Sequence, residues 1–199
     1  MNLEGIDRRE WLAFNRLSVK IVGNEAASVL FAHGRVCLPH VCAWSKGGPM
    51  SHPPFVIRRS LWPEEKESLI GIRSTVFVEE QGFPAEIDLD GRDEEAFHLA
   101  AEVHGRMIGT ARLLWEDAGE GERFGHIGRV AVLKEYRGGG VGSALIQEMV
   151  AVGRSQGCGF VELDSQLLAV PFYERLGFEA VGEEFQEAGQ PHWRMVNPL

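Results

Sequence analysis

The sequence predicts a mixed α/β fold, in which helices pack against one mixed sheet in a single domain that follows an N-terminal extension. Strand-like and helix-like segments alternate through most of the 199 residues. A run of glycines separates one of these strands from the helix after it. The length supports the same reading, because a chain of this size forms one large domain and buries a core without disulfides or metals.

Each element follows from a local pattern, in chain order. Phe55–Arg58 is a short apolar strand. Pro63 and the two glutamates after it open a helix, because proline suits the first helical turn and carboxylates suit the positive helix end. Apolar residues at helical spacing continue that helix to Phe77. The order is β, α, β, β, β, α, β, α, β, β, with later strands over 97–103, 107–115, 126–133, 160–164, 178–183 and 192–196 and later helices over 141–152 and 167–176.

Composition and charge describe a globular protein with an acidic body. Charged residues make up 25% of the chain and apolar types 44%, which excludes collagen-like and wholly disordered classes. The net charge of −9 divides into +2 over residues 1–52 and −11 over residues 53–199. An acidic body repels phosphates and anionic lipid headgroups, so we expect neither nucleic acid nor membrane as a partner. No apolar run reaches 18 residues, and the N-terminus lacks the apolar segment of a secretory signal.

Residues 1–52 differ from the rest and are predicted to be an extension or linker before a domain over residues 53–199. They hold weak apolar stretches and end in the linker-like Ser45–Pro49 and a proline-rich turn. Two interpretations stay open. Either Met50 is the natural start of the protein, or the extension forms a genuine N-terminal helix that packs on the body.

Cysteine and histidine usage indicates neither a disulfide framework nor a metal site. The chain has three cysteines, which cannot all pair, so a reducing cytoplasm is the expected location. Four candidate metal ligands gather in the extension: His33, Cys37, His40 and Cys42. Their spacing matches no established zinc pattern, and we therefore predict no metal.

A glycine-rich turn stands between the strand over 126–133 and the helix that begins at Val141. It reads Arg137-Gly138-Gly139-Gly140-Val141-Gly142. The first amides of a helix have no internal partner, and glycine lets a ligand approach the backbone, so this turn suits a phosphate. A Walker loop would need a lysine that is absent here, and a dinucleotide G-x-G-x-x-G would lack its third glycine. A tight turn with no ligand is the alternative.

Three motifs in sequence order point to one family. They are Val130-Ala131-Val132, Arg137-x-x-Gly140-x-Gly142 and Tyr173-x-x-x-Gly177-Phe178. Together they resemble the GNAT superfamily of N-acetyltransferases over about residues 55–197. Within it the chain looks most like the ElaA-type branch, on the segments Arg73–Gln81, Ile127–Val130 and Gly189–His192. The resemblance implies a partly splayed mixed sheet that holds the pantetheine arm of acyl-CoA between its fourth and fifth strands.

The resemblance also implies a reaction and a cofactor site. A primary amine would attack the acetyl thioester of acetyl-CoA directly, in a ternary complex. The backbone of Val130, Ala131 and Val132 would bind the pantetheine and thioester. Arg137 and the amides of Gly138, Gly139, Gly140, Val141 and Gly142 would bind the pyrophosphate. Gln166 stands where many family members have an asparagine that contacts the cofactor.

Three residues are candidates for catalysis. Tyr173 matches the family motif, and its phenol would hydrogen-bond or protonate the departing thiolate, although the ring would also pack a helix on the sheet. His126 lies where the histone-acetylating branch has its general base, and it would otherwise be a plain strand-end histidine. Glu80 follows the first helix near the expected acceptor mouth, where a solvated acid is the alternative. His98 is either a core histidine or a site residue.

The acceptor is expected to be a small cationic amine, because the segments that flank it in the family are acidic here; surface solubility explains the same acids. A rival reading is an acyl-homoserine-lactone synthase, which shares an Arg-x-x-Val-Phe signature followed by acids. A second is a non-catalytic acyl-CoA sensor. The sequence leaves a homodimer open. The acids concerned are Glu79, Glu80, Glu86, Asp88, Asp90, Asp93, Glu183, Glu184 and Glu187.

Overall fold

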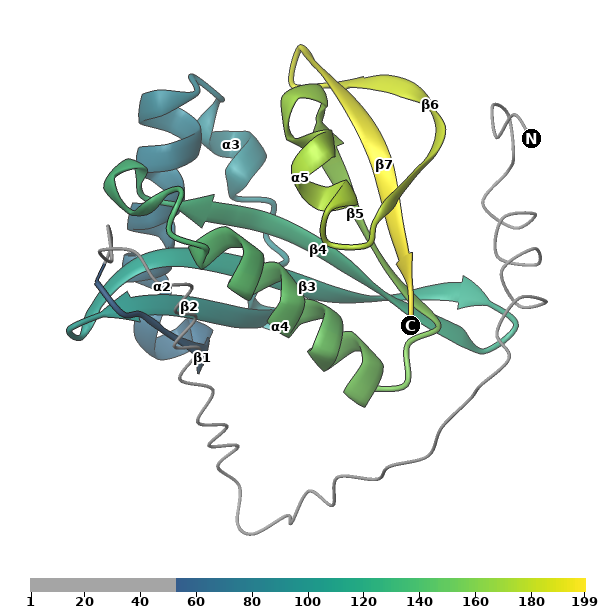
Figure 1. The fold of residues 1–199 in the computed structure, drawn as a ribbon, viewed down its shortest axis with the longest axis horizontal. Coiled ribbons are helices and arrows are strands. Elements are labelled where there is room, and N and C mark those ends of the chain that lie inside the picture. Colours follow the sequence, from purple (N-terminus) through teal and green to yellow (C-terminus); the bar gives the residue numbers. More distant parts are fainter. Residues whose placement is uncertain (1–52) are drawn as a thin grey trace, which may run out of the picture.

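The computed structural model describes residues 53–199, which form one mixed sheet with helices on both faces (Figure 1). The predictions for the extension, including its four candidate metal ligands, lie outside the described residues. The sheet has seven strands in the order β1-β2-β3-β4-β5-β7-β6. The strands are β1 (Val56–Ser60), β2 (Phe97–Val103), β3 (Arg106–Gly119), β4 (Glu122–Val132), β5 (Phe160–Gln166), β6 (Glu179–Glu187) and β7 (Gln190–Pro198).

Helix α4 crosses one face of the sheet and α2 lies on the other (Figure 1). The α-helices are α2 (Trp62–Arg73), α3 (Ala85–Asp88), α4 (Val141–Ser155) and α5 (Val170–Glu174). A π-helix over Ser74–Glu80 continues α2. Three short 3₁₀ turns cover Asp93–Glu95, Lys134–Tyr136 and Leu167–Ala169. The predicted mixed α/β class and element order are therefore confirmed.

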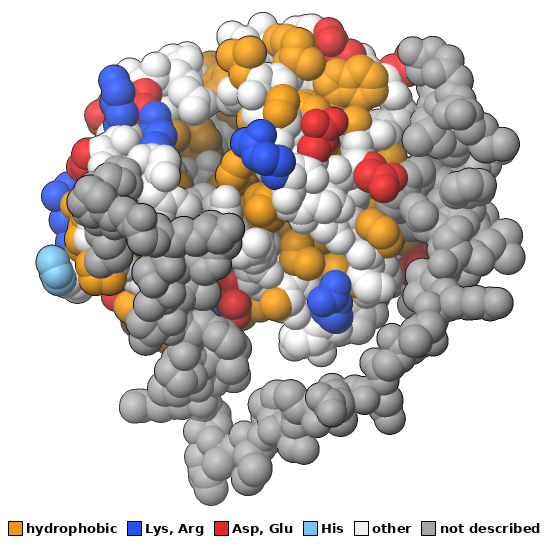
Figure 2. Space-filling view, in the orientation of Figure 1, with side chains coloured by type: hydrophobic (Ala, Val, Ile, Leu, Met, Phe, Trp, Pro, Cys, Tyr) orange, Lys and Arg blue, Asp and Glu red, His pale blue; other side chains and the backbone are white. Residues whose placement is uncertain are grey.

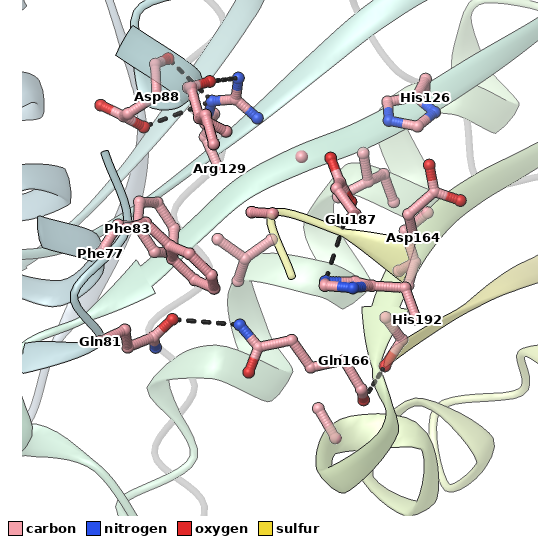
Figure 3. Close-up of a pocket in the computed structure, with 18 of the residues that line it drawn as sticks. Phe77, Gln81, Phe83, Asp88, His126, Arg129, Asp164, Gln166, Glu187 and His192 are labelled. Atoms are coloured by element: carbon pink, nitrogen blue, oxygen red, sulfur yellow. Dashed lines mark hydrogen bonds and ion pairs between the residues drawn. The ribbon is translucent and has the colours of Figure 1, made fainter. Parts of the chain in front are cut away.

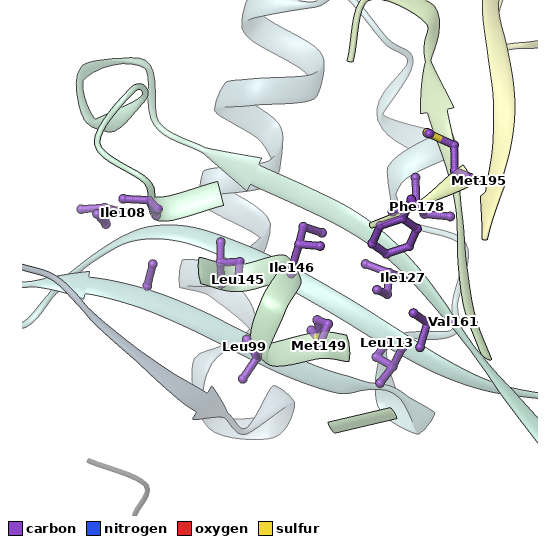
Figure 4. Packing of buried hydrophobic residues seen from close by; sticks show 14 of the residues in the cluster. Leu99, Ile108, Leu113, Ile127, Leu145, Ile146, Met149, Val161, Phe178 and Met195 are labelled. Carbon is purple, nitrogen blue, oxygen red and sulfur yellow. The ribbon is translucent and has the colours of Figure 1, made fainter. Parts of the chain in front are cut away.

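The core lies between α4 and the sheet (Figure 4). Leu145, Ile146 and Met149 repeat at helical spacing along α4, so one face of the helix is fully buried. They pack on side chains that alternate along the strands, among them Leu99 and Leu113. This packing fixes the strands that carry the site.

Within residues 53–199, β4 and β5 are the only parallel pair of strands, and they part soon after they meet. Their register runs from Phe124 opposite Phe160 to His126 opposite Glu162. Beyond that point β4 stays paired with β3 and β5 with β7. The sheet is thus splayed between its fourth and fifth strands, as the resemblance implied.

A β-bulge sits on β4 just above this point. Thr110 pairs with Ala131 and Arg112 with Gly128, so β4 carries one more residue than β3 between the two pairs. Arg129, at the bulge, has a φ of 54°, which is unusual for a residue with a side chain. A bulge leaves backbone groups outside the ladder, and here they lie at the edge of the gap between β4 and β5.

Several predicted boundaries are corrected. The first helix does not run on as an α-helix to Phe77, because the chain widens into the π-helix after Arg73. The last predicted helix breaks into a 3₁₀ turn and α5, because Pro171 belongs to a first turn and not to a helix interior. Between the π-helix and β2, where no helix is predicted, lie α3 and a 3₁₀ turn. The β3–β4 hairpin is longer than predicted, since its polar tip lacks apolar alternation.

Candidate active site

A cleft of about 260 Å³ opens where β4 and β5 separate. Figure 3 shows two walls that face each other across it. One comes from the π-helix and the segment after it, and the other from β4, β5 and the β6–β7 hairpin. The first wall is mainly apolar, and the second carries most of the titratable groups. The principal lining residues are Phe77, Gln81, Phe83 and Ile87 on the first wall and His126, Asp164, Gln166, Glu187 and His192 on the second.

Tyr173 reaches the cleft from α5. Its ring packs edge-to-face on Phe172 and Phe178, with ring centroids 4.9 and 5.9 Å away. Burial disfavours the charged phenolate and raises the pKa of Tyr173 to about 12. The residue therefore combines a packed ring with a hydroxyl that stays protonated and able to donate a hydrogen bond.

His126 and Glu162 form a pair at the point where the strands part. His126 Nδ1 lies 3.4 Å from Glu162 Oε1. The glutamate is buried, whereas the histidine ring lines the cleft. A carboxylate only accepts hydrogen bonds, so Nδ1 donates and Nε2 keeps the lone pair that accepts a proton.

His192 is a second cleft histidine, on β7. Its Nδ1 lies 2.9 Å from the carbonyl oxygen of Gln190, and because a carbonyl only accepts, Nδ1 donates here as well. Its Nε2 lies 3.8 Å from Glu187 Oε2, at the end of β6. The lone pair of this ring and a glutamate carboxylate therefore stand side by side in the cleft (Figure 3).

The bulge is tied to the first wall by Arg129. Its Nε donates to the carbonyl oxygen of Asp88 at 3.0 Å, and its Nη2 to that of Ile87 at 2.7 Å. Nη2 also lies 3.1 Å from Asp90 Oδ2. Burial, together with the nearby Arg112 charge, lowers the pKa of Arg129. Its guanidinium thus fixes the wall to β4.

The first wall rests on a buried cluster of arginines and aspartates. Arg73 is fully buried, and its Nε donates to both carboxylate oxygens of Asp88 at 2.9 and 3.0 Å. Its Nη1 lies 2.8 Å from Asp93 Oδ1. Arg112 binds Asp93 at 3.1 Å and Asp90 at 2.6 and 2.8 Å. Asp88 and Asp93, two of the acids predicted to flank a cationic acceptor, are therefore buried in ion pairs, and of these two only Asp88 lines the cleft.

Burial and ion pairing compete at the acids of this cluster. Burial alone would raise the pKa of Asp93, but the Arg73 and Arg112 guanidiniums outweigh it and hold that pKa below its usual value. The hydrogen bond from Arg112 likewise lowers the pKa of Asp90. His98 also belongs to the core, since Nε2 contacts the Asp93 carbonyl oxygen at 2.8 Å and its ring stacks on Trp62.

The glycine turn forms an open cradle at the start of α4. Gly138 and Gly140 have φ values of 80° and 86°, so glycine is required by conformation. An added Cβ at either position would meet nothing within 4 Å, which leaves the backbone open to a ligand. No side chain caps α4, so its first amides are free to bind an anion. These residues fit the pyrophosphate of an acyl-CoA.

Arg137 and Glu80 pair beside this cradle. Arg137 Nη2 lies 2.8 Å from Glu80 Oε2, and its Nε donates to the Val132 carbonyl oxygen at 2.8 Å. Neither side chain lines the cleft. Glu80 therefore pairs with Arg137 beside the glycine turn and does not line the cleft, where the sequence led us to expect it.

The other predicted cofactor residues divide between cleft and core. Val130 and Gln166 line the cleft, whereas Val132 does not and the Ala131 side chain is buried beneath it. The Gln166 amide donates to Gln81 Oε1 at 3.1 Å and so joins the two walls (Figure 3).

Sequence reasoning missed part of the site. Nothing in a single sequence places Phe77 or Phe83 opposite His192, because the π-helix brings them there. The strained backbone of Arg129 also leaves no local signal. His192 is different, because the sequence does carry a local signal for it: this histidine lies in a predicted strand, three residues after Gly189.

Residues 53–199 hold no cluster of three or more histidine, cysteine or acidic side chains placed to bind a metal. No helix within the same range has both the length and the apolar character to cross a membrane.

Comparisons with known proteins agree on the family. The Acetyltransferase (GNAT) family profile matches residues 58–178. The *Bacillus subtilis* N-acetyltransferase YjcF is 31% identical over 134 residues, 67% of this chain and 92% of YjcF. A *Trypanosoma brucei brucei* glucosamine 6-phosphate N-acetyltransferase is 45% identical over 78 residues, 38% of this chain and 53% of that one. The crystal structure of *Escherichia coli* ElaA has a TM-score of 0.63 and 27% identity over 72% of this chain and 99% of ElaA. The protein belongs to the GNAT acetyltransferase family.

Proposed function

We propose that the protein transfers an acetyl group from acetyl-CoA to the nitrogen of a small cationic primary amine. Three neighbouring features of the fold support this proposal. The strands part at His126, the glycine cradle opens at the start of α4, and Tyr173 of α5 lines the cleft between the separated strands. In this reading acetyl-CoA supplies the activated acyl group and the acceptor enters from the side of His126 and His192.

The acceptor attacks as a free amine, so its ammonium must first give one proton to Nε2 of His126, whose ring Glu162 holds through Nδ1. A C–N bond then forms to the acetyl carbon, the C–S bond breaks, and its electron pair leaves on the sulfur. The second proton that the nitrogen loses passes to solvent, from which the released CoA thiolate is protonated. Glu80, the other predicted base, pairs with Arg137, and we assign it to the cofactor side.

Tyr173 supports the departing thiolate by a hydrogen bond. Its pKa of about 12 lies well above that of a thiol, about 8.5, so full proton transfer to sulfur runs uphill. A hydrogen bond needs no such transfer and strengthens as charge develops on sulfur. Of the two roles the sequence left open for Tyr173, the raised pKa therefore favours donation without protonation.

The acidic charge that reaches the cleft comes from the β6–β7 side. Glu187 lines the cleft, while Glu183 and Glu184 do not. Figure 2 shows several acidic side chains on the part of the surface near β6 and β7, with only scattered arginine and lysine. This favours a cationic acceptor. Most of the acids that the sequence analysis names for this role do not line the cleft.

The acceptor named for the trypanosomal relative fits poorly here. A sugar phosphate needs a cation free to bind it. Arg129 is the only arginine or lysine among the described residues that line the cleft, and two carbonyl oxygens and Asp90 engage it.

A coupled assay with product mass spectrometry tests the proposal. Acetyl-CoA and a panel of amines should give N-acetyl products and free CoA in equal amounts. Product from S-adenosylmethionine and an acyl donor would instead support a homoserine-lactone synthase. Stoichiometric binding of CoA with no turnover of any amine would support a sensor.

A further inference from the structure

We infer that the acceptor is an amphipathic monoamine: a primary amine with one ammonium, an apolar body, and neither a carboxylate nor a phosphate. This inference rests on the proposed function and narrows it. It comes from the contrast between the two walls of the cleft, each of which selects a different part of the acceptor.

The first wall selects an apolar body. Phe77 and Phe83 are partly exposed to the cleft, and Ile87 is 40% exposed, which is high for a large apolar side chain in a site. Two polar side chains share this wall: Gln81, whose Oε1 accepts a hydrogen bond from Gln166, and Asp88, which is paired with Arg73 and Arg129. Apolar surface of this kind gains free energy when a ligand covers it.

The second wall selects a single ammonium. His192 Nε2 and Glu187 Oε2 stand 3.8 Å apart, and both accept hydrogen bonds, so one nitrogen can donate to both. The other lining acids are already neutralised, because Arg194 binds Asp164 at 2.9 Å and Arg73 binds Asp88. Among the described lining residues, Glu187 is thus the one carboxylate with no arginine nitrogen within ion-pair distance, although its charge also acts on Arg194.

The lining also disfavours anionic acceptors. Arg129 is the only arginine or lysine among the described residues that line the cleft. Its guanidinium already donates to the backbone carbonyl oxygens of Ile87 and Asp88. A carboxylate or phosphate on the acceptor would enter a low-dielectric cleft beside Glu187 without a partner, which is costly. Amino acids and sugar phosphates should therefore be poor acceptors.

Pairs of acceptors that differ in one group test this directly. With the full-length enzyme and saturating acetyl-CoA, kcat/KM should be at least about tenfold higher for 2-phenylethylamine than for phenylalanine, which adds a carboxylate. The value of kcat/KM should also be higher for hexylamine than for 1,6-diaminohexane, because the second ammonium of the diamine would lie against the apolar wall. The reverse order in either pair would overturn the inference and leave the proposed function intact. No acetylation of any amine would contradict both.

A variant pair tests the residue that carries the ammonium. Glu187→Gln should raise KM for 2-phenylethylamine about tenfold and leave KM for acetyl-CoA within about twofold. Glu184→Gln is the matched control, since it removes the same charge from an exposed position of the same strand outside the cleft. Equal effects of the two variants would assign the change to overall charge and overturn the role of Glu187.

Discussion

At the scale of single residues, the account depends on which nitrogen of each cleft histidine is free. His126 and His192 both present Nε2 to the cleft because Nδ1 is held by an oxygen that only accepts. The partners differ: His126 is held by a buried carboxylate, which stabilises the positive ring that forms when Nε2 takes a proton. His192 is held by a neutral carbonyl. This contrast assigns proton transfer to His126 and recognition to His192.

Replacing His126 tests that assignment. His126→Gln keeps a polar side chain of similar size but removes the proton acceptor, so kcat should fall about 10²- to 10⁴-fold. Steady-state kinetics with an accepted amine measure this. His104→Gln, in an exposed turn, is the control, and equal losses in the two variants would refute the role of His126.

At the scale of elements, the buried ion cluster holds the first wall of the cleft in place. Removing Arg73 would leave Asp88 and Asp93 buried with too little positive charge. Arg73→Met should therefore lower the free energy of unfolding by about 3–5 kcal/mol. Arg92→Met is the matched control, because its ion pairs are exposed and should contribute less than about 1 kcal/mol. Urea denaturation compares them, and similar losses would contradict the account.

The same cluster sets a pH dependence of stability. The pKa values of Asp90 and Asp93 are lowered in the folded state, so below about pH 4 the unfolded chain binds more protons than the folded one. The stability they contribute is present at neutral pH and is lost as pH falls below that value. Urea denaturation at pH 7, 5, 4 and 3 should show a loss concentrated below pH 4. A pH-independent free energy across this range would contradict the burial of these ion pairs.

The glycine cradle is a third element that a substitution can test. Gly140→Asp places a side chain and a negative charge where pyrophosphate should bind, so CoA should no longer raise the melting temperature. Gly121→Asp has the same backbone strain and open surroundings in the distant β3–β4 hairpin, and it should keep the CoA response. Thermal denaturation with and without CoA measures this. A retained response in folded Gly140→Asp would exclude the cradle.

At the scale of the whole molecule, the sequence predicts what depends on local periodicity and misses what depends on distant contacts. α4 was predicted because Leu145, Ile146 and Met149 repeat at the spacing of one buried face. The Arg73–Asp88 pair was not, because a π-helix brings together residues 15 positions apart. The proposed cofactor side consists of consecutive glycines, whereas the cleft is assembled from four separate segments. That difference explains why the sequence does not reveal that Asp88 and Asp93 pair with a buried arginine.

The described domain should also stand alone. The recognisable fold begins with β1 at Val56, so a chain that starts at Met50 should fold, and CoA should raise its melting temperature as it does for the full-length protein. Insolubility of the shorter chain, or a loss of several kcal/mol in unfolding free energy, would show that the extension is integral.

The most direct test of the central claim is acetyl transfer by Tyr173→Phe under conditions where chemistry limits the rate. The variant removes one oxygen and keeps the ring that packs on Phe172 and Phe178, so its melting temperature should match the wild type. Single-turnover acetylation of an accepted amine should slow about 10²- to 10³-fold, the loss typical of one hydrogen-bond donor to a developing negative charge, with unchanged affinity for acetyl-CoA. Because the phenol has a pKa of about 12, the wild-type rate should show no alkaline limb from Tyr173 below pH 11. A folded variant within about threefold of the wild-type rate would contradict the placement of the reaction in this cleft.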